Sequence, residues 1–204
     1  VVVAGKFDPR TRAWYKTAEA EAGPVFSPIY KHFVMDDLTI SAAWPVYDRE
    51  GNLRGVLGTH MLLSGVGGFL KDIVRGYNGY AIIFERDTGL LIANSMELDN
   101  FSILSDGTFK RHEIGEIENS YIKKAYNDYS LTQDPHFTYR GESGKLFVGI
   151  REIHMPGVDW ILMSAIPDVL YMTSVVESIH MTVLLVALAL IFSVIVFNIA
   201  AGKL

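Results

Sequence analysis

The chain of 204 residues contains no cysteine, which limits its covalent and its metal chemistry. Disulfide bonds and cysteine-ligated metal sites are excluded, although a cysteine-free composition fits an exported bacterial domain as well as a cytosolic one. Basic stretches are missing too: the formal net charge is −5, and no block of like charge occurs. A nucleic-acid surface needs a basic stripe, so nucleic acid is not an expected partner.

Sequence patterns of catalysis and of metal binding are missing as well. The chain has no Gly-rich phosphate-binding loop and no Gly-x-Ser-x-Gly nucleophile elbow. No metal-ligand spacing connects four of its histidines, which are His112, His136, His154 and His180. We therefore expect no cofactor and no enzymatic activity in this region of the protein.

A long apolar run near the C-terminus is the most informative feature that the sequence does contain. Residues 181–201 carry no charged side chain and show no polar face at a helical period. At about 1.5 Å per residue, a helix of this length crosses the roughly 30 Å hydrocarbon core of a bilayer. A buried core helix is the alternative, but the length of the run favours a transmembrane helix.

The two ends of the chain indicate its orientation and its context. Lys203 is the single cation beside the apolar run on its C-terminal side, where the positive-inside rule places the cytoplasm. We therefore expect residues 1–180 to be extracytoplasmic and anchored to the cell (inner) membrane. Val1 is not an initiating Met, and the chain stops just beyond the run. We thus expect a piece of a longer protein, with an upstream anchor and a downstream cytoplasmic part.

Helical and strand patterns before the apolar run predict an α+β domain. Helices are predicted at residues 12–22, 64–75 and 117–129. Strands are predicted at residues 38–47, 53–63, 80–85, 90–94, 137–139, 146–153 and 160–166. Turn residues at 48–52 and 87–89 join strands into two antiparallel hairpins. Residues 95–116 are expected to form a loop with a short turn.

Local signals mark the ends of these elements. Gly23 and Pro24 are expected to end the first helix, with Gly23 as its left-handed cap residue. Ser64 can cap the second helix, and the Gly-Tyr-Asn-Gly break at residues 76–79 marks a predicted domain boundary. Pro167 fits the first position of a last helix that continues into the apolar run without a glycine or proline. One stiff helix would thus join the folded domain to the membrane.

Several motifs match a known family of sensors. Phe-Asp-Pro-Arg-Thr-Arg-Ala-Trp-Tyr at residues 7–15, Ser-Pro-Ile-Tyr at 27–30 and Gly-Val-Leu-Gly at 55–58 resemble the membrane-distal pocket of double Cache (dCache) extracytoplasmic sensor domains. Residues 80–95 look like the opening hairpin of the membrane-proximal module of that family, and residues 157–167 look like its last strand.

This resemblance implies two PAS-like modules, each an antiparallel sheet with flanking helices. Residues 1–75 would form a membrane-distal module truncated at its N-terminus, residues 76–166 a membrane-proximal module, and residues 167–204 the juxtamembrane and transmembrane helix. Receptors of this kind sense small molecules and commonly act as homodimers. Their missing cytoplasmic part would belong to a chemoreceptor, a histidine kinase or a diguanylate cyclase.

The resemblance also implies a ligand site. In family members that bind amino acids, an Arg-x-Trp-Tyr stretch holds the ligand carboxylate, and the matching residues here are Arg12, Trp14 and Tyr15. Tyr30 matches a further pocket tyrosine. A guanidinium pairs with two carboxylate oxygens, while indole and phenol groups add donors and flat walls. A surface ion pair for Arg12 and core packing for the two aromatic residues are the alternatives.

Departures from the family pattern concern the amino group of the ligand. Phe7 stands where amino-acid binders carry a tyrosine, and His32 and His60 stand where they use acidic residues to hold an ammonium. Imidazole repels or ignores an ammonium but can donate to a second anionic or carbonyl group. We therefore expect a carboxylate-bearing ligand without a free α-amino group, such as a small organic or dicarboxylic acid. A hydrogen-bonded structural histidine is the alternative for His60.

Two functions of other classes stay open at this point. One is a ligand-independent dimerisation or scaffold module, in which Arg12 and Trp14 only hold the fold. The other is a membrane-anchored extracytoplasmic enzyme, which would need an acid/base or nucleophile set that the sequence does not display.

Overall fold

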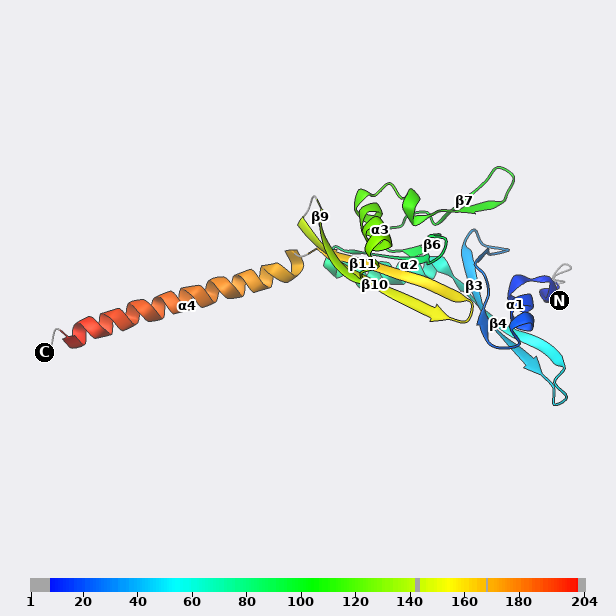
Figure 1. Cartoon of the computed structure of the whole chain (residues 1–204), viewed down its shortest axis with the longest axis horizontal. Helices are drawn as coiled ribbons and strands as arrows, with labels where there is room; N and C mark the ends of the chain where they lie inside the picture. Colours follow the sequence, from blue (N-terminus) through cyan, green and yellow to red (C-terminus); the bar gives the residue numbers. More distant parts are fainter. Residues whose placement is uncertain (1–7, 142–143, 168, 202–204) are drawn as a thin grey trace.

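The computed structural model describes residues 8–141, 144–167 and 169–201. The molecule is elongated: a small β-sheet with the N-terminal helix lies at one end, a larger sheet follows, and a long helix extends to the C-terminus (Figure 1). Both of these sheets are antiparallel and have helices beside them. The predicted α+β fold class with a C-terminal apolar helix is therefore confirmed.

The small sheet is built around one long hairpin. The elements of this part are η1 Pro9–Thr11, α1 Ala13–Glu21, β1 Val25–Phe26, β2 Tyr30–Lys31, β3 Leu38–Tyr47 and β4 Leu53–Leu62. Strand β3 pairs antiparallel with β1, β2 and β4. At the β3–β4 turn, Oδ1 of Asp48 accepts hydrogen bonds from the backbone N–H groups of Asn52 (2.7 Å) and Glu50 (3.1 Å). These bonds lower the pKa of Asp48, that from Asn52 most.

The larger sheet has the strand order β6-β5-β11-β10-β9. Its strands are β5 Tyr80–Glu85, β6 Leu91–Asn94, β9 His136–Gly141, β10 Gly144–Met155 and β11 Val158–Pro167. The helices around it are α2 Leu63–Val74, η2 Arg75–Tyr77, η3 Ile114–Glu116 and α3 Ser120–Thr132. The predicted strands at residues 80–85, 90–94, 146–153 and 160–166 are therefore confirmed, with longer bounds for the last two.

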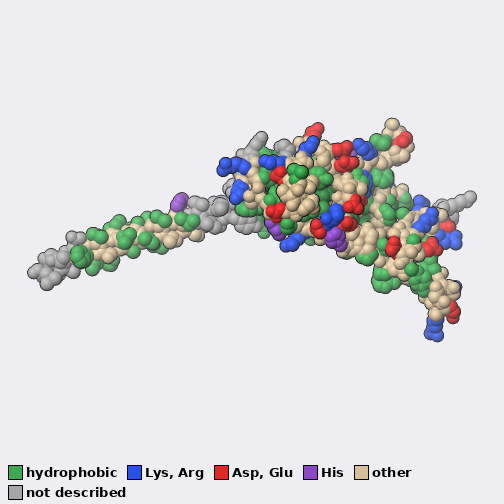
Figure 2. All heavy atoms as spheres, viewed as in Figure 1, with side chains coloured by type: hydrophobic (Ala, Val, Ile, Leu, Met, Phe, Trp, Pro, Cys, Tyr) green, Lys and Arg blue, Asp and Glu red, His purple; other side chains and the backbone are tan. Residues whose placement is uncertain are grey.

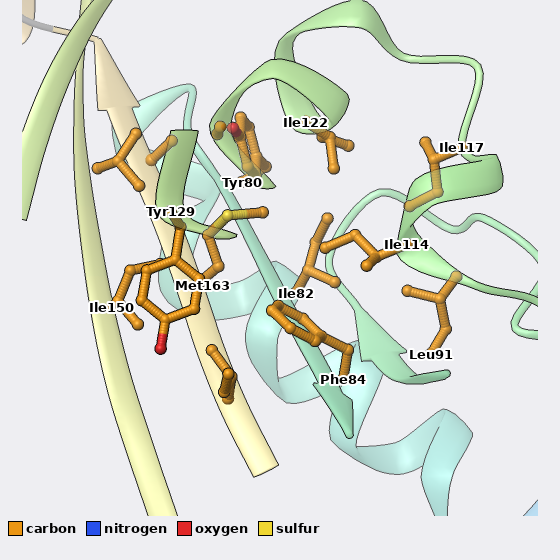
Figure 3. Packing of buried hydrophobic residues seen from close by; sticks show 14 of the residues in the cluster. Tyr80, Ile82, Phe84, Leu91, Ile114, Ile117, Ile122, Tyr129, Ile150 and Met163 are labelled. Atoms are coloured by element: carbon orange, nitrogen blue, oxygen red, sulfur yellow. The ribbon is translucent and has the colours of Figure 1, made fainter. Parts of the chain in front are cut away.

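Strand β5 is buried on both of its faces. Ile82 and Phe84 belong to a core with η3 and α3 (Figure 3). Ala81 and Ile83 point to the opposite face and pack in a second core that includes α2. Successive side chains of a strand face opposite sides of the sheet, so double burial requires apolar residues at every position. This explains why residues 80–84 form a continuous apolar run rather than an alternating one.

The second core also includes the small sheet. Leu38 and Ile40 of β3 share it with Leu63 and Leu70 of α2 and with Trp160 of β11. Side chains on both sides of the Gly76–Gly79 break thus pack together. The division into modules at residues 75 and 76 stays a prediction, and α2 joins the two sheets across it.

A tight turn makes a further contact between the two sheets. The backbone N–H of Phe26 in β1 donates to the carbonyl of Pro156, in the turn between β10 and β11 (2.9 Å). Gly157, the next residue, has a φ of 81°. A Cβ at this position would overlap the carbonyl oxygen of Phe26. Only glycine fits, because both the backbone conformation and the close approach exclude a side chain.

Two predicted helix caps are wrong. The residue with left-handed backbone at the end of α1 is Ala22, with a φ of 51°, and not Gly23. Helix α2 begins at Leu63 after Leu62, and no side chain caps it. The Ser64 hydroxyl donates instead to Oδ2 of Asp37 (2.5 Å). The chain passes directly from β4 into α2, so the turn that a capping serine would begin does not exist.

The region predicted as a loop contains a short further hairpin. Strands β7 Phe101–Ile103 and β8 Phe109–Arg111 pair antiparallel, and η3 follows them. Three-residue strands are too short to show a two-residue period, which is why the sequence pattern did not indicate them. Helix α3 begins at residue 120 rather than 117, because the Asn119 side chain caps it by accepting the backbone N–H of Tyr121 (3.0 Å).

The last helix, α4, spans Val169–Ala201. Within the described residues, its Ser178–Phe197 stretch is the one segment long and apolar enough to cross a membrane. Its side chains are exposed, and Figure 2 shows hydrophobic groups along it while charged groups gather over the folded part. Residues 178–197 therefore do not form a buried core helix in this structure. Pro167 ends β11, so its predicted role as first helical residue is wrong, and Lys203 lies outside the described residues.

The close contact between Gly157 and Phe26 leads to a first testable prediction. Gly157→Ala should lower the free energy of unfolding by about 3 kcal/mol, since left-handed strain of roughly 1–2 kcal/mol adds to overpacking. Gly107→Ala is the matched control, because Gly107 has a similar φ of 79° but no atom within 4 Å of its Cβ position. Denaturant unfolding of the purified chain in detergent, followed by tryptophan fluorescence, measures both. Equal losses for the two variants would contradict a role of the Phe26 contact.

Candidate ligand-binding site

A pocket of about 320 Å³ lies beside the start of α1, in the part of the molecule farthest from α4. Nine described residues line it, namely Thr11, Arg12, Ala13, Trp14, Tyr30, Lys31, Phe33, His60 and Phe109. Four of the six predicted ligand residues are among them: Arg12, Trp14, Tyr30 and His60. The fold thus brings together, at one pocket, side chains that are up to 48 positions apart in the chain.

A short turn positions Arg12. Asp8 begins η1, where its Oδ1 accepts the backbone N–H of Arg10 (3.0 Å), and Arg12 follows as the residue between η1 and α1. The carboxylate of Asp8 also pairs with the guanidinium of Arg10 (2.8 Å). The hydrogen bond from the Arg10 side chain lowers the pKa of Asp8. Arg12 is exposed and lines the pocket.

Trp14 packs directly on the backbone of β4. A Cβ on Gly58 would lie 3.0 Å from two carbons of the indole ring, so glycine lets the ring approach the strand. The ring also meets the imidazole of His60 edge to face, with centroids 5.7 Å apart. Such contacts hold an aromatic ring in one orientation. The ring forms part of the pocket and at the same time covers the small core that contains Ala18 and Ala43.

A hydroxyl network fixes Tyr30 and His60. The buried Ser41 Oγ lies 2.8 Å from the Tyr30 hydroxyl and 2.7 Å from Nδ1 of His60, and the tyrosine hydroxyl lies 3.1 Å from the same nitrogen. The backbone N–H of Ser41 donates to Oγ of Ser27 (3.1 Å). His60 is thus hydrogen-bonded through Nδ1 and also lines the pocket. This position is compatible with a structural and with a ligand-binding role.

Two predicted residues do not line this pocket. Tyr15 packs edge to face against Trp14, with 5.8 Å between the ring centroids. His32 stabilises its own turn, because its Nδ1 accepts the backbone N–H groups two and three residues later (3.2 and 3.0 Å). Its ring stacks on Phe33, which does line the pocket. A ligand role for Tyr15 and His32 stays a prediction, and Phe7 lies outside the described residues.

The structure adds pocket residues that sequence reasoning missed, above all Lys31, Phe33 and Phe109. The ammonium of Lys31 pairs with Asp36 (2.7 Å). Lys31 and Phe33 are neighbours of predicted residues, so their position in the sequence was a usable signal. Phe109 comes from β8 and had no such signal.

Charge distinguishes this pocket from two others. A pocket of about 530 Å³ between the sheets is lined by apolar residues and Thr59. Another of about 530 Å³ beside η3 carries four acidic residues, Asp99, Glu113, Glu116 and Glu118. A backbone hydrogen bond from Glu113 lowers the pKa of Glu116. Among the described residues that line the Arg12 pocket there is no Asp or Glu, so of these three pockets the Arg12 pocket suits an anion best.

Comparison with known proteins gives one curated sequence relative. It is the methyl-accepting chemotaxis protein McpC of Bacillus subtilis, which is 29% identical over 100 residues. These residues make up 48% of this chain and 15% of McpC. No protein-family model matches the chain.

Solved structures show the fold. The ligand-binding domain of the Pseudomonas fluorescens chemoreceptor CtaA, in complex with L-leucine, matches 79% of this chain with a TM-score of 0.51 and 19% identity. That of Pseudomonas aeruginosa PctC, in complex with GABA, matches 81% with a TM-score of 0.51 and 22% identity. PctB of the same species, in complex with L-Arg, matches 85% with a TM-score of 0.52 and 15% identity.

This chain has the double Cache fold. It covers 61%, 66% and 61% of the three solved domains, in the order given above, so it spans somewhat less than two thirds of their length. Within the double Cache fold of this chain, the Arg12 pocket lies at the end opposite α4 (Figure 1).

A second testable prediction follows from the contact between Gly58 and Trp14. Gly58→Ala should displace the indole ring, because the added methyl would lie 3.0 Å from it. Gly55→Ala on the same strand is the matched control, since no atom lies within 4 Å of its Cβ position. With 5-fluorotryptophan incorporated, ¹⁹F NMR should show a shift of the Trp14 resonance in Gly58→Ala alone. An unmoved resonance would mean that β4 does not position the ring.

Proposed function

We propose that this chain is the extracytoplasmic sensor domain of a transmembrane receptor and binds a small carboxylate-bearing ligand in the Arg12 pocket. The observation that carries the proposal is the meeting of Arg12, Trp14, Tyr30 and His60 at one pocket of a double Cache fold. The apolar helix α4 at the other end of the fold supports a membrane receptor. The similarity to the chemotaxis protein McpC and to the chemoreceptor CtaA supports the same class of protein.

The side chains of the pocket match a carboxylate. A guanidinium can pair with both oxygens, and hydroxyl and imidazole groups add hydrogen-bond donors. A bound α-ammonium would need an anionic partner, and the described lining residues supply none. These features favour an organic acid without a free α-amino group. Amino acids are the competing ligand class, because the solved double Cache neighbours were crystallised with L-leucine, GABA and L-Arg.

Signalling would be a shift between two arrangements of the domain. A ligand that binds one arrangement better favours it, and a few kcal/mol of differential affinity is enough. Strand β11 leads to α4, so a change in the sheet reaches the membrane helix. We place residues 1–180 outside the cell (inner) membrane and expect a homodimer. The McpC similarity favours a chemotaxis output over a histidine kinase or a diguanylate cyclase.

A ligand-independent dimerisation or scaffold module is the second candidate. The contact of Trp14 with Gly58 favours it, because that contact would hold the fold whether or not a ligand binds. The two functions differ in what they require of Arg12, which is exposed and lines the pocket.

Replacement of Arg12 tests the proposal. Arg12→Ala should weaken carboxylate binding about 10- to 100-fold, since a charge-assisted hydrogen bond contributes about 1.5–3 kcal/mol. Arg10→Ala is the matched control: it removes an equal charge two residues away that pairs with Asp8. Calorimetric titration of the chain in nanodiscs with propanoate, succinate and L-alanine measures the affinities, and thermal melting checks folding.

Each outcome has a distinct meaning. Organic acids that bind and depend on Arg12, but not on Arg10, support the proposed site. Tight binding of L-alanine would contradict the absence of ammonium recognition. An unmodified chain that is folded but binds no carboxylate would favour the scaffold function, and so would an Arg12→Ala variant whose only effect is unfolding.

A further inference from the structure

One residue of the Arg12 pocket comes from a distant part of the chain. Eight of its described lining residues lie between Thr11 and His60, whereas Phe109 belongs to β8, beyond the start of the larger sheet. The pocket is therefore not formed by the small sheet and α1 alone. A ligand in it would touch both halves of the structure.

Phe109 is held in place from two sides. Its ring meets that of Phe101 on β7 edge to face, with centroids 6.4 Å apart, and both rings pack against the core that joins the sheets. Two residues further on, the Arg111 guanidinium donates to the Glu85 carboxylate (2.6 Å) and to the carbonyl of Leu91 (3.0 Å). These bonds tie β8 to β5 and β6. Phe109 is thus held in place by packing and by the bonds of its strand, and it forms part of the pocket lining.

The remaining groups of the pocket divide into one anion site and an aromatic wall. Arg12 lines the pocket and matches the arginine that the family resemblance assigns to the carboxylate, so we assign Arg12 to the ligand. Phe33 and Phe109 add aromatic surface to that of Trp14. Aromatic walls favour a ligand with an apolar, preferably flat, group. A ligand that uses the whole pocket would therefore carry one carboxylate and one apolar group.

We propose that Phe109 is a ligand-contacting residue that selects monocarboxylates with an aromatic or branched apolar group. This inference rests on the proposed function, because it needs the carboxylate to bind at Arg12. It goes further in naming the ligand class and in assigning the selection to a residue of the β7–β8 hairpin. A small acid such as propanoate binds through its carboxylate alone, whereas 3-phenylpropanoate also reaches the aromatic wall.

Affinity measurements with these two acids test the inference. In nanodiscs, the full chain should bind 3-phenylpropanoate more tightly than propanoate. Phe109→Ala should weaken 3-phenylpropanoate about tenfold, which corresponds to roughly 1.4 kcal/mol, and leave propanoate unchanged. Leu104→Ala is the matched control, because it removes an exposed apolar side chain of the same β7–β8 hairpin that does not line the pocket. It should leave the preference between the two acids unchanged.

A second variant covers a loss of folding. If thermal melting shows that Phe109→Ala is unfolded, Phe109→Leu keeps an apolar side chain in the core while removing the ring. A reduced preference for 3-phenylpropanoate, with propanoate binding intact, supports the inference. An unchanged preference overturns it.

Failure of the inference and failure of the proposed function are distinguishable. If both acids bind through Arg12 and Phe109→Ala weakens both equally or neither, only the inference falls. The same holds if the unmodified chain does not prefer 3-phenylpropanoate. If neither acid binds the folded chain, or if Arg12→Ala leaves binding unchanged, the proposed site falls and the inference falls with it.

Discussion

Packing on both faces of β5 and β6 is the constraint on which the rest of the structure depends. One face of this strand pair packs on α3 and η3, and the other packs on α2 and the start of β3. The second core contains Leu38 as well as Trp160, so residues of the small sheet and of the larger sheet lose contact with water together. Burial of apolar area stabilises each side chain by about 1.5–3 kcal/mol relative to exposure. Neither half can expose this shared surface without losing that stabilisation.

This shared core decides where the candidate site lies. It holds the β7–β8 hairpin against the small sheet, and Phe109 thereby becomes a wall of the pocket that Arg12 and Trp14 line. At the other contact between the halves, Gly157 lets the β10–β11 turn meet β1. Strand β11 then leads towards α4. The contacts that stabilise the molecule therefore connect the Arg12 pocket with the sheet whose strand β11 leads towards α4.

Sequence reasoning performed best where a pattern is local and long. The β3–β4 hairpin, strands β5 and β6 and the apolar stretch of α4 agree with prediction because period, turn residues and length are all written in neighbouring positions. Prediction from the sequence was less accurate at the ends of the helices. Ser64 lies in the first turn of α2 without capping it, and Ala22 rather than Gly23 takes the left-handed conformation. For α2 the reason is that β4 passes directly into the helix, so no turn exists for a serine to cap.

The candidate site divides in the same way. The residue types of a carboxylate site, Arg12, Trp14 and Tyr30 above all, are recognisable from motif and family resemblance, and His60 from a departure from that family. The tertiary structure shows that these residues converge on one pocket and that Phe109 of β8 joins them there. It also shows that Lys31 pairs with Asp36. By itself the sequence determined the membrane helix, the main hairpins and the chemistry available to a ligand, since these follow from local periodicity and side-chain type. Only the tertiary structure decided which side chains share a cavity, because that depends on burial between segments far apart in the chain.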